Sequence, residues 1–257
     1  MRASLTLQTG TLYSFLLVLA RVSGALAFVP FPGFTAAVGP VRAAFCLGLT
    51  IALFPFWPLV PDASPGPFTL LAWVAGELAV GIAIGAAVAI MLEAFLLAGQ
   101  VLGLQAGYAY AQTVDPNTQA DSGILLVVAQ LMAGLCFFAL GFDREILRLF
   151  ARSLLKIPPG RYVFGPPAAE IMIRLSCELF AVGVRLALPV VALLVMVDVA
   201  LALLGRLNAQ LQLLSLAFPM KMLIALAVLI WIAALFPRIL GEFGGQGLAA
   251  AGRMLGI

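Results

Sequence analysis

The sequence has 257 residues, of which 64% are hydrophobic and 10% are charged, and its mean hydropathy is +1.16. A typical soluble domain is about half apolar and about a quarter charged, so a water-facing surface could not cover this many apolar side chains. The formal net charge is +3, and the basic residues form no dense Lys/Arg run. The sequence therefore lacks the usual pattern of a nucleic-acid-binding protein. The composition predicts an integral membrane protein.

Six apolar segments follow one another along the chain, separated by turns that are mostly proline-rich. They run near 12–29, 43–60, 69–98, 123–142, 179–204 and 211–236. Each can cross about 30 Å of hydrocarbon as a helix that rises about 1.5 Å per residue. Only helices and closed β-barrels span membranes, and these runs are too long and too evenly apolar for barrel strands. We therefore expect each run to be a helix. We predict an all-α fold with about six long apolar helices, in a single membrane-embedded domain over residues 1–257.

The first segment carries Arg21 near its middle and ends in Pro30-Phe31-Pro32-Gly33. A secretory signal peptide ends instead in a small-x-small cleavage site, so we expect no cleavage here. If every segment spans, nine Lys and Arg residues fall on one side of the membrane and two on the other. This bias predicts that both termini are cytoplasmic.

The third segment contains small residues at regular helical spacing. Glu77, Gly81, Gly85, Ala89 and Glu93 recur every four residues, and Gly99, Gly103 and Gly107 form a second stripe. Small residues at this spacing let two helix backbones approach closely. We therefore predict helix packing or a subunit interface at Gly81, Gly85, Gly99 and Gly103. The spacing fits a partner in the same chain as well as one in another subunit.

The segment 104–123 is the least lipid-like part of the chain, although it joins two strongly apolar segments. Its polar and aromatic residues include Gln105, Tyr108, Tyr110, Gln112, Thr113, Asp115, Asn117, Gln119 and Asp121. Irregular backbone at membrane depth is tolerated only where protein buries it or where it lines water. This loop is expected either to project into solvent or to sit in a pore.

A basic amphipathic helix is predicted after the fourth apolar segment. Arg144, Arg148, Arg152 and Lys156 recur every four residues and are interleaved with apolar side chains. This pattern is typical of an interfacial helix that lies under anionic lipid headgroups. The alternative is a docking face for an acidic cytoplasmic partner.

Six ionisable side chains lie inside the apolar segments, three basic and three acidic. They are Arg21, Glu77, Glu93, Arg185, Asp198 and Lys221. Charges at that depth cost about 2.5–3.5 kcal/mol on insertion scales and usually face a partner or a water-filled cavity. Paired charges that fix helix register and a proton relay both fit, and the lack of histidine favours paired charges.

No common catalytic or metal-binding pattern is present. The sequence has no histidine, no HExxH and no GxSxG, and Cys46, Cys136 and Cys177 are far apart with no CxxC spacing. An aspartyl pair of Asp198 with Asp115 or Asp121 is formally available, although these residues belong to different kinds of segment. We expect no enzymatic activity, no metal and no cofactor.

The loop resembles that of a known family. Residues Gly103–Gln119 are similar to the loop of the FliR family of export-gate proteins, which serves flagella and virulence type III secretion. Two further stretches also match: 31–42, with its Phe-Pro-Gly and Pro-Val-Arg motifs, and 188–221, which ends in Phe-Pro-Met-Lys. Length, number of apolar segments and motif order agree along essentially the whole chain.

The resemblance implies a subunit of the protein-export gate in the bacterial inner membrane, within the flagellar basal body. It implies a hetero-oligomer with the P and Q export-gate subunits and other membrane proteins of the apparatus, helices arranged as hairpins, and a pore for unfolded exported proteins. It also implies a plug loop over about Gly107–Ser122. The plug residues carried over are Gly107, Tyr108, Tyr110, Gln112, Asp115, Pro116 and Asp121. The compact form of the chain favours a flagellar system.

A small-solute or ion-coupled secondary transporter is the alternative function. In that case Glu77, Glu93 and Asp198 would couple protons or cations to transport. Such transporters often contain internal repeats, and this sequence has no convincing one.

Overall fold

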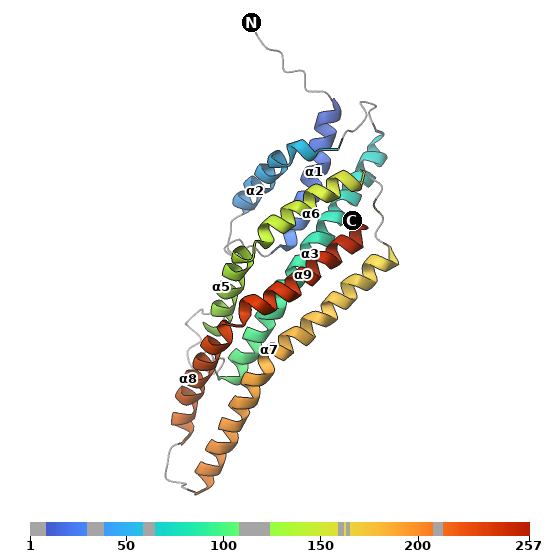
Figure 1. Ribbon diagram of the computed structural model, residues 1–257. Coiled ribbons are helices and arrows are strands. Elements are labelled where there is room, and N and C mark those ends of the chain that lie inside the picture. The colour runs from blue at the N-terminus through green and yellow to red at the C-terminus, as the bar shows by residue number, and fades with distance from the viewer. Residues whose placement is uncertain are drawn as a thin grey trace. The chain divides into compact units, whose positions relative to one another are not determined.

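The computed structural model describes residues 9–29, 39–58, 65–107, 124–158, 162, 165–207 and 213–257. Within these ranges every regular element is a helix, which confirms the all-α prediction. The elements are α1 (Thr9–Phe28), α2 (Gly39–Ala52), the 3-10 helix η1 (Phe54–Phe56), α3 (Pro67–Gln105), α5 (Ile124–Ala139), α6 (Phe142–Lys156), α7 (Pro166–Leu207), α8 (Leu213–Ala233) and α9 (Phe236–Leu255) (Figure 1).

Each of the six predicted apolar segments overlaps a helix. Among the described residues, α1, α3 and α7 up to Arg206 are long and apolar enough to cross a membrane alone. The helices α5 and α6 are long and apolar enough to cross a membrane only when they are taken together, and the chain bends by 62° between them. The helix α2 and residues Met220–Ile230 of α8 are shorter apolar helices. The apolar helical architecture is confirmed. The predicted orientation of the termini requires that every segment spans, and it stays a prediction.

Prolines explain where several helices begin and end. The predicted segment 43–60 is α-helical only to Ala52 and then forms the 3-10 helix η1, because Pro55 and Pro58 cannot donate backbone hydrogen bonds to continue α2. The helices α3 and α7 both begin at a proline, the residue type favoured at a first helical position. Starting at Pro166, α7 begins well before the predicted segment 179–204.

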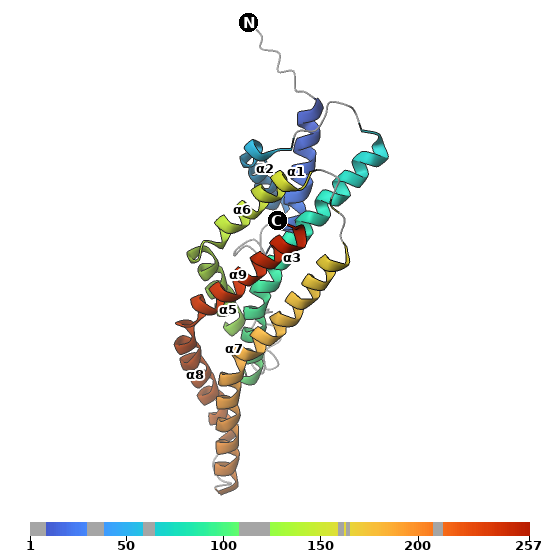
Figure 2. The same ribbon diagram turned by 45° about the vertical axis from the view of Figure 1, so that its right-hand side comes forward.

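The chain divides into two compact units. The first comprises Met1–Ile90, Gly141–Leu175 and Gly244–Ile257, and the second comprises Met91–Leu140 and Ser176–Phe243. In the first unit α1 packs against α2, as both views show (Figures 1 and 2). A separate cluster joins parts of α3, α7 and α9 through Ala87, Ala168, Leu175, Ala250, Ala251 and Met254.

The core of the second unit joins α3, α7 and α8 mainly through small and branched side chains. It contains Ala98, Leu102, Ala106, Ala187, Val190, Leu194, Ala225 and Leu229. A Cβ atom built on Gly183 would lie 3.0 Å from the carbonyl oxygen of Ala94, so α7 and α3 run close together there. Phe95 and Phe236 pack with ring centroids 4.5 Å apart.

The helix α7 presents a large apolar surface to its surroundings. Only 17% of its most apolar stretch is buried within the chain, against 61% for α3. Its exposed side chains include Phe180, Val184, Leu188, Met196, Val199 and Leu203. An apolar surface of this extent requires lipid or other subunits around it.

Candidate functional site

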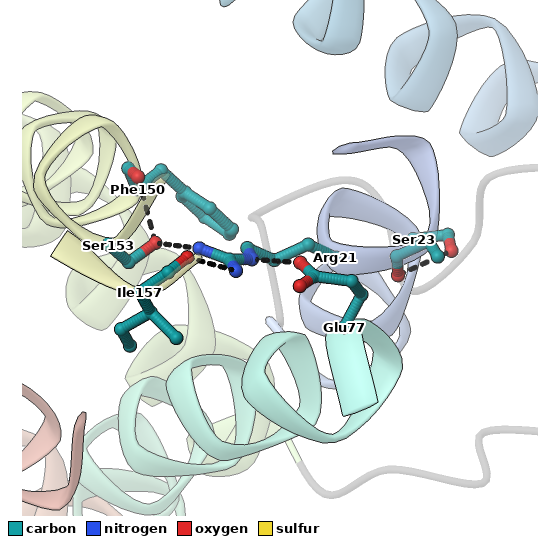
Figure 3. A network of polar contacts seen from close by, with 7 residues as sticks. Arg21, Ser23, Glu77, Phe150, Ser153 and Ile157 are labelled. Carbon is teal, nitrogen blue, oxygen red and sulfur yellow. Dashed lines mark hydrogen bonds and ion pairs between the residues drawn. The ribbon is translucent and has the colours of Figure 1, made fainter. Parts of the chain in front are cut away.

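Arg21 of α1 lies at the centre of a buried polar network in the first unit (Figure 3). Its Nε donates a hydrogen bond of 2.6 Å to Oε2 of Glu77 on α3, and the two side chains are 1% and 2% exposed. Its Nη1 donates to Oγ of Ser153 on α6 at 3.0 Å, and its Nη2 donates to the carbonyl oxygen of Ile157 at 3.4 Å. This buried clamp, Arg21–Glu77–Ser153–Ile157, links three segments that are distant in sequence.

The chemistry of the clamp suits packing better than proton transfer. Ser153 accepts a hydrogen bond from Arg21 and donates one to the carbonyl oxygen of Phe150 at 2.8 Å. The ion pair with Glu77 neutralises a charge whose burial alone would cost several kcal/mol. A guanidinium does not release its proton in proteins, so Arg21 cannot serve as a relay. These contacts support the paired-charge interpretation of Arg21 and Glu77.

The helices α1 and α3 touch backbone to backbone beside the clamp. A Cβ atom built on Gly81 would lie 2.0 Å from the carbonyl oxygen of Arg21, and one on Gly85 would lie 2.3 Å from that of Ala25. From the other side, a Cβ atom on Gly24 would lie 2.6 Å from the backbone of α3. Gly81 and Gly85 therefore pack against α1 of the same chain. A larger residue at either position would force the two helices apart.

The second glycine stripe has different surroundings. Gly99 is buried, whereas no atom of another described segment lies within 4 Å of a Cβ position built on Gly103. Gly103 therefore makes no close helix contact within the described part of the chain. Its assignment to a subunit interface stays a prediction.

Gly107 lies just beyond the end of α3, where the predicted plug begins. Its φ of +83° is a left-handed conformation that favours glycine, and its N–H donates to the carbonyl oxygen of Leu104 at 3.2 Å. The other predicted plug residues lie outside the described residues: Tyr108, Tyr110, Gln112, Asp115, Pro116 and Asp121. Their contacts stay predictions.

The other predicted intramembrane charges lie in the second unit. Lys221 on α8 and Asp198 on α7 form an ion pair, with side chains 16% and 38% exposed. Glu93 on α3 and Arg185 on α7 are exposed, and neither forms an ion pair within the described residues. Two of the three acidic groups are thus paired with a basic one, and Glu93 is the acid still open to another role.

The helix α6 has the predicted amphipathic character. Arg144, Arg148, Arg152 and Lys156 are all exposed, while Ile146, Phe150 and Leu154 are buried. Arg148 is paired with Glu145 of the same helix, and this pair lies on the surface. The basic face is therefore available to lipid or to a partner, and the buried face holds α6 in the first unit.

Within the described residues, no three His, Cys, Asp or Glu side chains lie close enough together to hold a metal ion. Cys46, Cys136 and Cys177 are free thiols.

Sequence reasoning missed Ser153, although a signal for it was present. Ser153 lies three residues after Phe150 and seven after Ile146, so it shares their helical face. A polar residue on the apolar face of an amphipathic helix needs a buried partner. That pattern could have directed attention to Ser153, whereas nothing in the sequence singled out the carbonyl of Ile157.

The profile of the family described as bacterial export proteins, family 1, matches residues 12–245. The chain belongs to this family. The flagellar biosynthetic protein FliR of Escherichia coli strain K12 is 27% identical over 199 residues, which cover 77% of this chain and 75% of that protein. FliR of Caulobacter vibrioides is 25% identical over 217 residues, with 83% and 85% covered, and FliR of Bacillus subtilis is 26% identical over 221 residues, with 84% and 85% covered.

These matches confirm the resemblance that rested on the loop and on the two flanking stretches. The chain is a multi-pass membrane protein of the FliR family, and its relatives carry flagellar names. The matched range includes Arg21, Glu77, Ser153 and the whole of the predicted plug. The buried clamp and the loop therefore both lie within the part of the chain that matches the family profile.

Proposed function

We propose that this chain is a non-enzymatic subunit of the export gate of the flagellar type III secretion apparatus, in the bacterial inner membrane. In this role it assembles with the P and Q export-gate subunits and other membrane proteins of the apparatus. Unfolded exported proteins pass through the pore that the assembly forms. The family match over residues 12–245 is the observation that carries the proposal.

Two features of the structure support a role within an assembly. The helix α7 buries only 17% of its most apolar stretch within the chain. It also carries the exposed Arg185, which forms no ion pair within the described residues and would gain from an acidic partner in a low-dielectric environment. Both features fit a helix surrounded by other subunits.

We further propose that residues Gly107–Ser122 form the plug of the closed gate. The left-handed Gly107 supports this assignment because it stops α3 abruptly and lets the chain turn away from the helix axis. Just before it, Ala98, Leu102 and Ala106 of α3 are buried in the core that α3 forms with α7 and α8. A loop that blocks a pore needs a fixed attachment of this kind on at least one side.

Deletion of Gly107–Ser122 tests the plug. We expect the assembly to form in normal yield but the membrane to leak ions, because the pore loses the segment that fills it. The measurement is ion conductance, or sensitivity to small toxic solutes, in cells that express the assembly, with the yield of copurified subunits measured in parallel.

A second variant separates the loss of the plug residues from the shortening of the chain. Replacement of the same residues by a Gly/Ser segment of equal length keeps the connection between α3 and α5 and removes the bulky side chains, including Tyr108 and Tyr110. It should leak as the deletion does. An assembled complex that stays tight with both variants would show that the loop does not gate the pore.

A secondary transporter remains the second candidate, and Glu93 is the observation that favours it. Glu93 is an exposed acid within an apolar helix and forms no ion pair in the described part of the chain. The other two acids are less suited to ion coupling because Glu77 and Asp198 are bound to Arg21 and Lys221. Solute uptake by the purified chain alone in liposomes, abolished by Glu93→Gln, would establish transport.

A further inference from the structure

A groove lies between α6 and the C-terminal part of α9, from residue 244 onward. Both belong to the first unit. Arg148, Leu149 and Arg152 line it from α6, and Gly245, Leu248 and Ala249 line it from α9. Its volume is about 450 Å³, which is within the range of about 300–1,000 Å³ typical of small-ligand sites. The two helices run next to each other in both views (Figures 1 and 2).

The charge along the α6 side of the groove is positive. Arg148 and Arg152 are one helical turn apart and both are exposed, and Glu145 is the acidic residue of α6 that lines the groove. Glu145 is already bound to Arg148. Arg152 forms no ion pair within the described residues, so its guanidinium has donors free for an anion. Guanidinium groups match the geometry of phosphate oxygens.

The α9 side of the groove is apolar and open. Leu248 and Ala249 line the groove from α9 and Leu149 lines it from α6, so this part of its lining is hydrocarbon. No other described segment has an atom within 4 Å of a Cβ position built on Gly245, and Gly245 itself is exposed. The absent side chain of Gly245 keeps this part of the groove empty. A larger residue would fill it without striking the described part of the chain.

We propose that this groove binds one anionic phospholipid. Its phosphate lies at the guanidinium groups of Arg148 and Arg152, and the first part of an acyl chain lies against Leu149 and Leu248, over Gly245. The combination of a basic wall and an apolar wall favours this occupant, because an acidic peptide would use the charges and leave the hydrocarbon uncovered. The apolar helices of the chain place it in a membrane, whose headgroup layer contains anionic phospholipids. The inference does not depend on the gating proposal.

Native mass spectrometry of the full chain, purified in mild detergent with the subunits that accompany it, tests this site. The probe is phosphatidylglycerol, and phosphatidylcholine is the zwitterionic comparison. We expect one retained phosphatidylglycerol per chain and much weaker retention of phosphatidylcholine. The double variant Arg148→Gln/Arg152→Gln should lower retention about tenfold or more, because each basic residue near an anionic headgroup contributes appreciably. Gly245→Phe should lower it to a similar degree by filling the groove.

Matched controls separate the groove from general charge and size effects. Arg253→Gln removes an exposed charge from α9 that does not line the groove, and Gly245→Ala adds one methyl group. Both should retain phosphatidylglycerol as the unchanged protein does. Helix content by circular dichroism monitors folding, and the arginine variants alter only exposed side chains.

Three results would overturn the proposal. The first is equal retention of phosphatidylcholine and phosphatidylglycerol. The second is unchanged retention in both the arginine pair and Gly245→Phe. The third is displacement by a competitor without an acyl chain: glycerol phosphate would indicate a free-phosphate site, and polyglutamate would indicate a docking face for an acidic protein.

Discussion

The contribution of a charged residue to stability depends on how deeply its side chain is buried. The pairs Arg174–Glu170 and Arg238–Glu242 lie on the surface, where an ion pair contributes about 0–1 kcal/mol. The side chains of Arg21 and Glu77 are almost completely buried, and each therefore depends on its partner. Removing one member of a buried pair leaves an uncompensated charge, at a cost of about 3–5 kcal/mol.

We therefore expect Glu77→Gln to destabilise the protein by about 3–5 kcal/mol, because the guanidinium of Arg21 stays buried without its counter-charge. Replacement of both residues by methionine should be less harmful than Glu77→Gln alone, because no unpaired charge then remains in the interior. Thermal unfolding in mild detergent, followed by circular dichroism, measures the order of the variants.

The matched control is Arg238→Gln, which breaks an exposed pair on α9 and should change stability by no more than about 0.5 kcal/mol. Equal melting temperatures for Glu77→Gln and Arg238→Gln would refute the structural importance of the clamp.

The element that organises the first part of the chain is α3, with its regularly spaced glycines. Gly81 and Gly85 remove the side chains that would otherwise separate α3 from α1, and the same close approach brings Glu77 within reach of Arg21. Gly103 lies farther along α3 and faces no other described segment within contact distance. One helix thus carries a glycine contact inside the chain and a glycine position that is open to its surroundings.

This difference leads to opposite expectations for two leucine substitutions. Gly85→Leu should abolish the folded chain, because its side chain would overlap the backbone of Ala25. Gly103→Leu should leave the isolated chain as stable as before and should reduce its copurification with other subunits. Yield and melting temperature of the chain report the first effect, and subunit recovery reports the second. Normal recovery with Gly103→Leu would show that this position faces lipid.

Elements were predictable where apolar character alone determines them. Six apolar runs indicated six helices, because a membrane leaves the backbone no other way to satisfy its hydrogen bonds. The helix α9 was not predicted because it is not a continuous apolar run, although its buried residues Phe236, Leu240 and Phe243 recur at helical spacing while Arg238 and Glu242 are exposed. The end of α2 at Ala52 was missed because apolar content was given more weight than Pro55 and Pro58.

For the whole molecule, the main observation is how much apolar surface its own helices leave uncovered. Of the three helices long enough to cross a membrane alone, α7 buries the least of its apolar stretch, and its exposed residues include Phe180, Leu188 and Met196. Membrane helices associate through close packing and polar contacts, since lipid covers apolar side chains equally well. Arg185 and Glu93 are exposed charges that could make such polar contacts with a neighbouring helix. Their exposure favours other subunits around the second unit.

Purification of the tagged chain in mild detergent should therefore yield a large hetero-oligomer. We expect native mass measurement to show this chain with two other kinds of small membrane protein. Because an exposed charge in lipid is costly, Arg185→Glu should reduce recovery of the assembly more than Arg185→Gln does. Recovery of a lone monomer under conditions that preserve other membrane complexes would contradict the export-gate proposal.

The site was predictable in kind and only partly in detail. The sequence indicated paired buried charges, because three acids and three bases lie within apolar segments. It did not indicate which charges pair, since Arg21 and Glu77 are 56 residues apart and a one-dimensional pattern holds no distance between helices. Ser153 joined the network only when the position of α6 was known.

The spacing of the clamp along the chain has a consequence for biosynthesis. Arg21 leaves the ribosome 56 residues before Glu77 and 132 residues before Ser153. At translation rates of about 5–20 residues per second, the nascent α1 waits on the order of ten seconds for its last side-chain partner. During that interval its guanidinium must be accommodated by the insertion machinery or by water. Final docking of this helix is therefore a late step, completed only after more than half of the polypeptide has been made.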